Sequence, residues 1–216
     1  NRLIGHVRPM VGTQGEGNTF PGAVAPFGMI QISPDTEDSL WETASGYEYS
    51  DSSIIGFSLT HLSGTGIPDL GDFLFVPQIG TPKFTPGPKA DPDSGYRSPY
   101  SHHGELATPG YYKVKLDKSR VIAEMTTADR SGILRFTFPA TDSAYVVTDL
   151  HHVLRWDVVW SNLRVLNDTT VTGYHVVNGW AKDRHLYYAA HYSRAFDDYG
   201  IMKDGQPVIY NGYRFR

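Results

Sequence analysis

Carboxylic side chains that could act in pairs gather in two segments of the first third of the chain. The first segment holds Asp35, Glu37, Asp38 and Glu42, and the second holds Asp69 and Asp72. A carboxylic acid and a carboxylate on either side of a glycosidic bond can hydrolyse it, one protonating the leaving group and the other activating water. Both segments are rich in turn residues, where such side chains more commonly hold the turn itself. We therefore interpret these six residues as turn formers and assign none of them a catalytic role.

The nine histidines raise the question of a metal site. Two adjacent pairs occur, His102–His103 and His151–His152. Neighbouring residues in a strand point to opposite faces, so such a pair cannot hold one ion together. The chain has no cysteine, which excludes disulfides, thiolate zinc sites and a cysteine nucleophile. We predict no metal site formed by this chain.

Two loop residues are candidates for contact with a ligand. Trp41 stands next to Glu42 after a polar turn, and an indole ring beside polar groups suits the apolar face of a sugar. A place in the core is an equally good reading of Trp41. His61 precedes the Gly-rich run Ser63–Gly66, where it is either a ligand contact or a buried, hydrogen-bonded histidine.

The elements that must position these loops are β-strands. Apolar residues alternate with polar ones in short runs from residue 111 onward, as in Tyr112–Leu116 and Leu134–Phe138. Only Val153–Leu163 permits a short helix. The fold class is therefore all-β, an antiparallel sandwich with many strands and long loops. Thr81–Pro99 is rich in proline and reads as an exposed connection without regular structure. Three further tryptophans are expected in the core: Trp156, Trp160 and Trp180.

Composition narrows the possible partners. The chain has 216 residues, 19 Lys+Arg against 23 Asp+Glu, and a formal net charge of -4. No basic block occurs, so we expect no nucleic-acid partner. No apolar run reaches the length of a membrane span, so we expect none. Aromatic residues make up 13% of the chain, which argues for a folded domain.

Several motifs in a fixed order resemble the N-terminal domain of glycoside hydrolase family 92, the calcium-dependent exo-α-mannosidases of bacteria. The resemblance runs nearly from end to end, and the order and spacing of the motifs make it specific. These motifs are Pro9–Thr13, Asn18–Ala23, Pro26–Met29, Ser33–Thr36, Ser45–Tyr47, Tyr49–Asp51, Ile55–Ser58, His61–Gly66, Asp69–Asp72, Pro109–Tyr112 and Gly179–Ala181.

The resemblance implies a large sandwich of the galactose mutarotase type, residues 1–216, at the start of a longer chain. A helical toroid outside this chain would carry the catalytic acid, the carboxylates that activate water, and most of the Ca²⁺ site. The whole protein would invert the anomeric carbon of terminal α-mannosides in glycans, with α-1,2 linkages expected first, and would be exported. This chain alone would be inactive and would supply one wall of the pocket.

The substrate-binding residues that the resemblance implies lie on three loops: Phe20, Gly22, Trp41, His61, Ser63, Gly64 and Thr65. Trp41 would stack on the leaving-group sugar, and His61 and Ser63 would donate or accept hydrogen bonds there or support groups that do. Two positions depart from the family pattern. Leu59 stands where many relatives have histidine, and Ile67 stands where cysteine is frequent. One alternative is a stand-alone carbohydrate-binding module, and a weaker one is a sugar epimerase using His175 or His185.

Overall fold

The computed structural model describes residues 3–208 and 214–215. The chain divides into two compact units, Asn1–Arg155 and Trp156–Arg216. Strands dominate both units, and the short helical turns are all of the 3-10 type. The all-β prediction is confirmed. Among the described residues no helix is long and apolar enough to cross a membrane.

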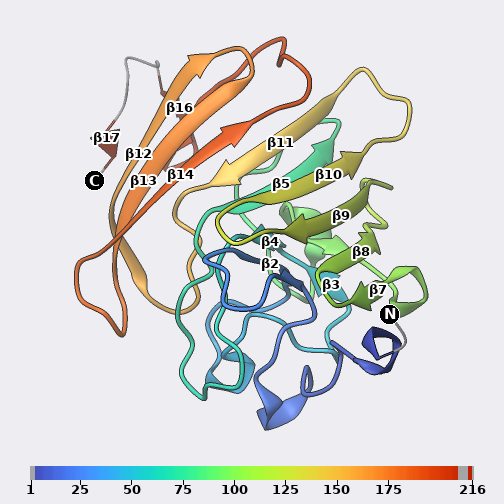
Figure 1. Cartoon of the computed structure of the whole chain (residues 1–216). Helices are drawn as coiled ribbons and strands as arrows, with labels where there is room; N and C mark the ends of the chain where they lie inside the picture. Colours follow the sequence, from blue (N-terminus) through green and yellow to red (C-terminus); the bar gives the residue numbers. More distant parts are fainter. Residues whose placement is uncertain (1–2, 209–213, 216) are drawn as a thin grey trace. The chain divides into compact units, whose positions relative to one another are not determined.

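The first unit is a sandwich of two antiparallel sheets (Figure 1). One sheet has the order β1-β2-β4-β5-β11, with β1 Ala23–Val24, β2 Gln31–Asp35, β4 Gly56–Ser58, β5 Leu74–Ile79 and β11 Ala144–Asp149. The other has the order β10-β9-β8-β7, with β7 Leu106–Thr108, β8 Tyr111–Lys115, β9 Ile122–Thr127 and β10 Gly132–Thr137. A two-stranded ribbon pairs β3 (Ser53–Ile54) with β6 (Ser98–Pro99).

The core of this unit lies between its two sheets. One sheet contributes Ile32 and Phe57, and the other contributes Tyr112, Ala123 and Met125. The alternation predicted from Tyr112 onward is confirmed, because β8 alternates buried and half-buried residues and β9 does so over its first four. Burial of such side chains stabilises the unit by roughly 25 cal/mol per Å² of apolar surface. The sandwich is the rigid body from which the long loops extend.

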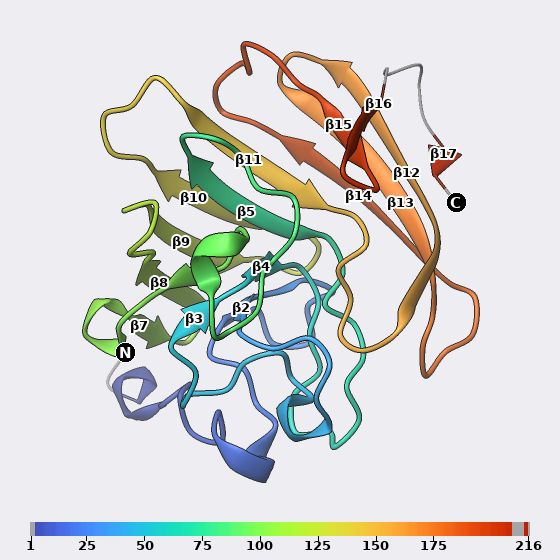
Figure 2. The same ribbon diagram turned by 180° about the vertical axis from the view of Figure 1, so that it is seen from behind.

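The second unit is an antiparallel sheet with the order β14-β13-β12-β17. Its strands are β12 Asp157–Asn167, β13 Thr170–Asn178, β14 Arg184–His191 and the short β17 Arg214–Phe215, and a separate hairpin pairs β15 Ile201–Lys203 with β16 Gln206–Val208. Figure 2 shows these strands from behind. The sequence Tyr210–Arg216, with Asn211–Gly212 at its turn, predicts a further hairpin, but it falls largely outside the described residues.

Three local predictions are wrong. The segment that permitted a helix, Val153–Leu163, instead leads into β12, where Asp157 to Val165 pairs with β13, with one register shift between Val158 and Trp160. Thr81–Pro99 is not wholly exposed, since it contains the 3-10 turn Pro92–Ser94 (η4), β6 and the buried Arg97. Trp180 is 62% exposed and so lies outside the core. Trp156 and Trp160 are only half-buried.

Candidate functional site

Three loops of the first unit meet at Asn18. The carbonyl of Asn18 accepts a hydrogen bond from the Gly64 N–H at 2.6 Å, and its Oδ1 accepts one from the Ala44 N–H at 3.2 Å. Ala44 directly follows the 3-10 turn Trp41–Thr43 (η3). Both views show these blue to cyan segments together at the lower end of the sandwich (Figures 1 and 2). We call them the loop face, residues 12–22, 36–48 and 58–72.

The loop face contains all seven residues that the resemblance implies for sugar binding. Trp41 is 45% exposed, Ser63 and Gly64 are exposed, and Phe20 and Thr65 are half-buried. The Thr65 hydroxyl donates to the carbonyl of Ile67 at 3.2 Å. These side chains can reach a ligand directly.

Gly22 and His61 lie deeper. A side chain at Gly22 would collide with the backbone of Ile32 and Ser33, so the glycine permits close packing on β2. His61 is only 3% exposed, and its ring lies 5.0 Å from that of Phe20, measured between centroids. His61 can therefore hold Phe20 and the Gly64 loop in place while remaining covered.

A buried carboxylate, Asp35 at the end of β2, joins two histidines. His61 Nε2 lies 2.8 Å from Asp35 Oδ1, and His152 Nε2 lies 2.8 Å from Asp35 Oδ2. His61 Nδ1 lies 2.7 Å from the carbonyl of Gln31, which can only accept, so Nδ1 carries a hydrogen. His61 therefore bridges the backbone of β2 and the buried carboxylate through its two ring nitrogens.

The electrostatics of this group follow from its contacts. Burial by itself raises the pKa of Asp35, but the charge of His61 and the hydrogen bonds from both rings outweigh it and hold the pKa at about 2. Burial lowers the pKa of His152, but the hydrogen bond and the charge of Asp35 outweigh it, and the pKa of His152 is raised. Carboxylate and imidazole thus favour each other's charged forms.

Gly46 makes room for the buried group. Its φ of +84° lies in the left-handed region, and a Cβ there would collide with Asp35 Oδ1. The Gly46 carbonyl accepts the N–H of Thr36 at 2.7 Å, which closes the 36–46 loop over the carboxylate. Only glycine satisfies both the backbone conformation and the contact.

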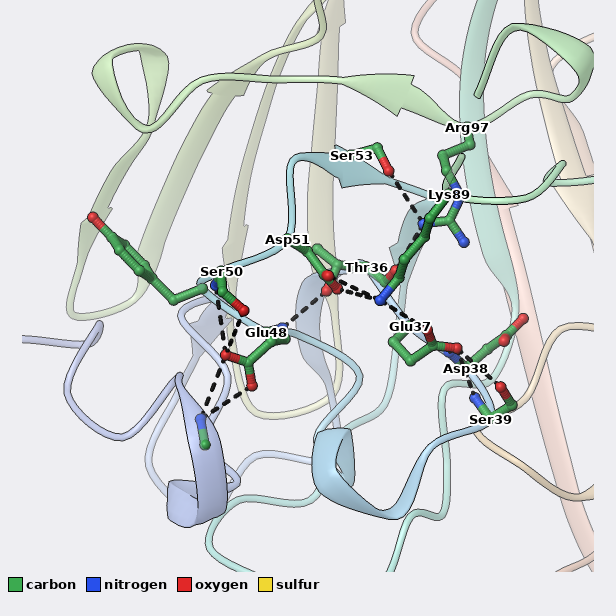
Figure 3. Close-up of polar contacts among 12 residues, drawn as sticks. Thr36, Glu37, Asp38, Ser39, Glu48, Ser50, Asp51, Ser53, Lys89 and Arg97 are labelled. Atoms are coloured by element: carbon green, nitrogen blue, oxygen red, sulfur yellow. Dashed lines mark hydrogen bonds and ion pairs between the residues drawn. The ribbon is translucent and has the colours of Figure 1, made fainter. Parts of the chain in front are cut away.

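A second polar group fixes the part of the loop that leads to Trp41. Figure 3 shows Lys89 between two carboxylates, with Nζ 2.8 Å from Glu37 Oε2 and 2.8 Å from Asp51 Oδ1. The other oxygen of Glu37 accepts hydrogen bonds from the N–H of Asp38 and the hydroxyl of Ser39. Hydrogen bonds and charge from these neighbours outweigh burial and lower the pKa of Glu37 to about 2.

Replacing Lys89 with methionine tests how much this bridge contributes. Because the amine is partly exposed, we expect the free energy of unfolding to fall by no more than about 1 kcal/mol. The loss should shrink at high salt, which screens the bridge in the parent protein. Urea unfolding at low and high ionic strength measures both effects, with Lys113→Met on β8 as the control. A loss that is the same at both salt concentrations would contradict an electrostatic role.

The prediction that the acidic residues are turn formers is wrong for Asp35, which lies in β2 and makes the long-range contacts just described. Glu37 holds its own turn, because its Oε1 accepts the N–H groups of Asp38 and Ser39, and it also makes the long-range contact with Lys89. The prediction suits Asp69, whose Oδ1 accepts the next residue's N–H at 2.7 Å. The histidine pairs do not lie in strands. His102 belongs to the 3-10 turn His102–Gly104 (η5) and contacts the buried Glu105, whereas His152 lies in the loop after β11.

Three residues that shape the loop face are not among the predicted substrate-binding residues. Asn18 had a local signal, since asparagine after glycine commonly adopts the left-handed conformation it shows here, with φ of 51°. Lys89 lay in the proline-rich stretch and Arg155 in the segment that permitted a helix, and no local pattern marked either of them. His175 and His185, the epimerase candidates, point to opposite faces of the second unit's sheet, and His175 is fully buried.

A Ca²⁺ ion requires six to eight oxygen ligands at one place. Within residues 3–208 and 214–215 no group of three or more His, Asp or Glu side chains is arranged to hold a metal ion. The acidic cluster at Glu37 and Asp51 already holds an amine. The described residues therefore do not fit a calcium ion.

The antiparallel sandwich is that of an N-terminal domain found in a family of glycosyl hydrolases. The model of the glycosyl hydrolase family 92 N-terminal domain matches residues 6–213, and the chain belongs to this family. The structure of the family GH92 alpha-mannosidase BT3965 from Bacteroides thetaiotaomicron, in complex with mannoimidazole, is 53% identical over 100% of this chain, with a TM-score of 0.95. The inverting mannosidase BT2199 from the same bacterium is 26% identical over 95% of the chain, with a TM-score of 0.77.

A fungal relative completes the comparison. An uncharacterized secreted glycosidase of Arthroderma benhamiae is 34% identical over 144 residues, which is 63% of this chain. The chain spans 17% of that protein and 28% of the length of BT3965. These matches therefore identify the family of this domain, which is one part of a longer protein in its relatives.

Proposed function

We propose that this chain forms one wall of the substrate pocket of an exported, inverting exo-α-mannosidase that removes terminal mannose from glycans, with α-1,2 linkages as the first substrates to test. The observation that carries the proposal is the exposed indole of Trp41 on the loop face. It stands on the same face as Ser63 and Gly64, in a domain 53% identical to part of an alpha-mannosidase. The pocket would be completed by a helical catalytic domain in the remainder of the protein.

The proposal assigns the catalytic acid, the carboxylates that activate water and the ligands of Ca²⁺ to that remainder. An inverting hydrolase needs two carboxyl groups about 6.5–9.5 Å apart, with room for water between one of them and the sugar. Asp35 is buried between two histidines, and Glu37 is engaged by Lys89. Neither suits such a role, so the 216-residue chain alone is expected to be inactive.

Replacing Trp41 with alanine tests whether its indole forms part of the wall of the substrate pocket. In the full-length protein Trp41→Ala should lower kcat/KM for an α-linked mannobiose by about tenfold, mainly through KM, because stacking on an aromatic ring is lost. Tyr145→Ala, an exposed aromatic on β11, is the control and should leave kcat/KM unchanged. Failure of the full-length protein to release mannose would refute the proposed activity. If the protein is active and Trp41→Ala has unchanged kinetics, only the role of Trp41 in the pocket wall would be refuted.

The exposed indole also suits a second function, a carbohydrate-binding module that acts without catalysis. Isothermal titration of the 216-residue chain with mannose separates the two. One wall of a divided pocket should bind mannose too weakly to saturate. Saturable binding by the chain alone, lost in Trp41→Ala, would favour the binding module.

A further inference from the structure

The indole of Trp41 is covered on one face by a cation. The guanidinium carbon of Arg155 lies 4.3 Å from the centroid of the Trp41 ring, within the range of a cation–π interaction. Arg155 is exposed, and Trp41 keeps 45% of its surface exposed beside it. A ligand on this indole therefore also meets a guanidinium group.

The backbone holds Arg155 in an uncommon conformation. Its φ is +75°, in the left-handed region that a side chain with a Cβ disfavours. Its N–H donates to the carbonyl of Asp38 at 2.5 Å, and its Nη1 donates to the carbonyl of Ser39 at 3.0 Å. Both acceptors lie just before Trp41 in the chain. Unfavourable backbone conformations that persist through such contacts are concentrated at functional sites.

The residues before Arg155 fix the segment from the other side. Leu154 is fully buried, and its N–H donates to the carbonyl of Leu70 at 2.8 Å. Two positions earlier, His152 binds the buried Asp35. The segment is thus held by the buried carboxylate, by Leu154 and by the Trp41 turn. This fixed path directs the guanidinium to the indole.

We propose that Arg155 determines specificity for the leaving group and selects glycosides whose leaving group is itself a sugar. This inference rests on the proposed function. A guanidinium carries five N–H donors in a rigid plane, of which the Ser39 carbonyl takes one. Two neighbouring hydroxyls of a sugar stacked beside Trp41 can accept from this plane. An aryl leaving group can stack on the indole but has no hydroxyls to accept, so it gains nothing from Arg155.

The test compares two substrates in the full-length protein. Arg155→Ala should lower kcat/KM for an α-linked mannobiose by about tenfold. It should change kcat/KM for phenyl α-mannoside, whose aryl group carries no acceptor substituent, by less than about twofold. Arg155→Lys keeps the charge but loses the planar donors, so it should recover only a small part of the loss. Arg135→Ala is the control, because Arg135 is an arginine on β10 that pairs with Glu124 on β9, away from the loop face. Equal losses on both substrates, or full recovery by lysine, would overturn the proposal.

Binding gives a readout that does not depend on turnover. Isothermal titration of the full-length protein with the sulfur-linked analogue of mannobiose, which is not hydrolysed, should show about tenfold weaker binding for Arg155→Ala than for Arg135→Ala. If the parent protein binds this analogue but releases no mannose from mannobiose, the proposed function fails, and weaker binding by Arg155→Ala still supports a contact of Arg155 with the second sugar. Equal affinities of the two variants overturn the role of Arg155, whether or not the protein is active. Absence of binding by the parent protein overturns both.

Discussion

Replacement of Asp35 with asparagine is expected to lower the free energy of unfolding of the first unit by about 3–5 kcal/mol. Asp35 is completely buried and each of its oxygens faces one imidazole nitrogen at 2.8 Å. An amide offers one acceptor oxygen, so one ring loses its partner while it stays buried. Breaking a buried ionic pair is costly because the remaining group keeps its desolvation penalty.

Urea unfolding of the 216-residue chain measures this loss. Asp142→Asn is the matched control, since Asp142 is exposed in the loop before β11, and it should shift stability by less than about 0.5 kcal/mol. A loss below about 1 kcal/mol for Asp35→Asn would show that the carboxylate is replaceable by any polar side chain.

Stability of the first unit should reach its maximum between roughly pH 5 and 6.5 and fall on both sides. The pKa of Asp35 is lowered to about 2 from 3.8, so its contribution is present above the unfolded value and is lost as pH falls through 2. That shift corresponds to about 2 kcal/mol. The pKa of His152 is raised from 6.5, so its contribution is complete below 6.5 and is lost as pH rises through the folded value. Glu37 adds a smaller loss on the acid side because it is less buried.

Unfolding midpoints in urea, measured from pH 2 to pH 9, test both the acid limb, where stability falls as pH decreases, and the alkaline limb, where it falls as pH increases. His152→Gln should flatten the alkaline limb, because glutamine does not titrate, and should leave most of the acid limb in place. His103→Gln, a change at an exposed histidine of η5, is the control and should keep both the acid and the alkaline decline. Constant stability of the parent chain from pH 6 to pH 9 would contradict the raised pKa of His152.

The strands were predictable where one face of a strand is more exposed than the other. Tyr112 and Lys113 in β8 show the alternation that such strands require. Strand β5 escaped because its residues Leu74–Gln78 are all buried and Pro77 interrupts the run. Burial on both faces removes the periodic signal, and proline usually argues against a strand in the interior of a sheet.

The site was predictable only as far as local patterns reach. Trp41 and the Ser63–Gly66 run were identified from their neighbours and from the family motifs. The contact of Asp35 with His152 was not, because 117 residues separate the two and no spacing rule relates them. The buried Arg97 shows the same limit. Its guanidinium binds the carbonyl of Thr36 at 2.7 Å, although its sequence neighbourhood is that of an exposed loop.

The long separation between Asp35 and His152 bears on how the first unit folds during synthesis. Asp35 leaves the ribosome 117 residues before its second histidine, and the pairing of β5 with β11 also awaits the later segment. Contacts between distant residues form slowly because the closure of a long loop costs entropy before any contact stabilises it. Nascent chains that end before residue 152 therefore hold a half-paired carboxylate and an incomplete sheet. Such chains expose an open strand edge at β5, and they are the stage at which chaperone contact or aggregation is expected.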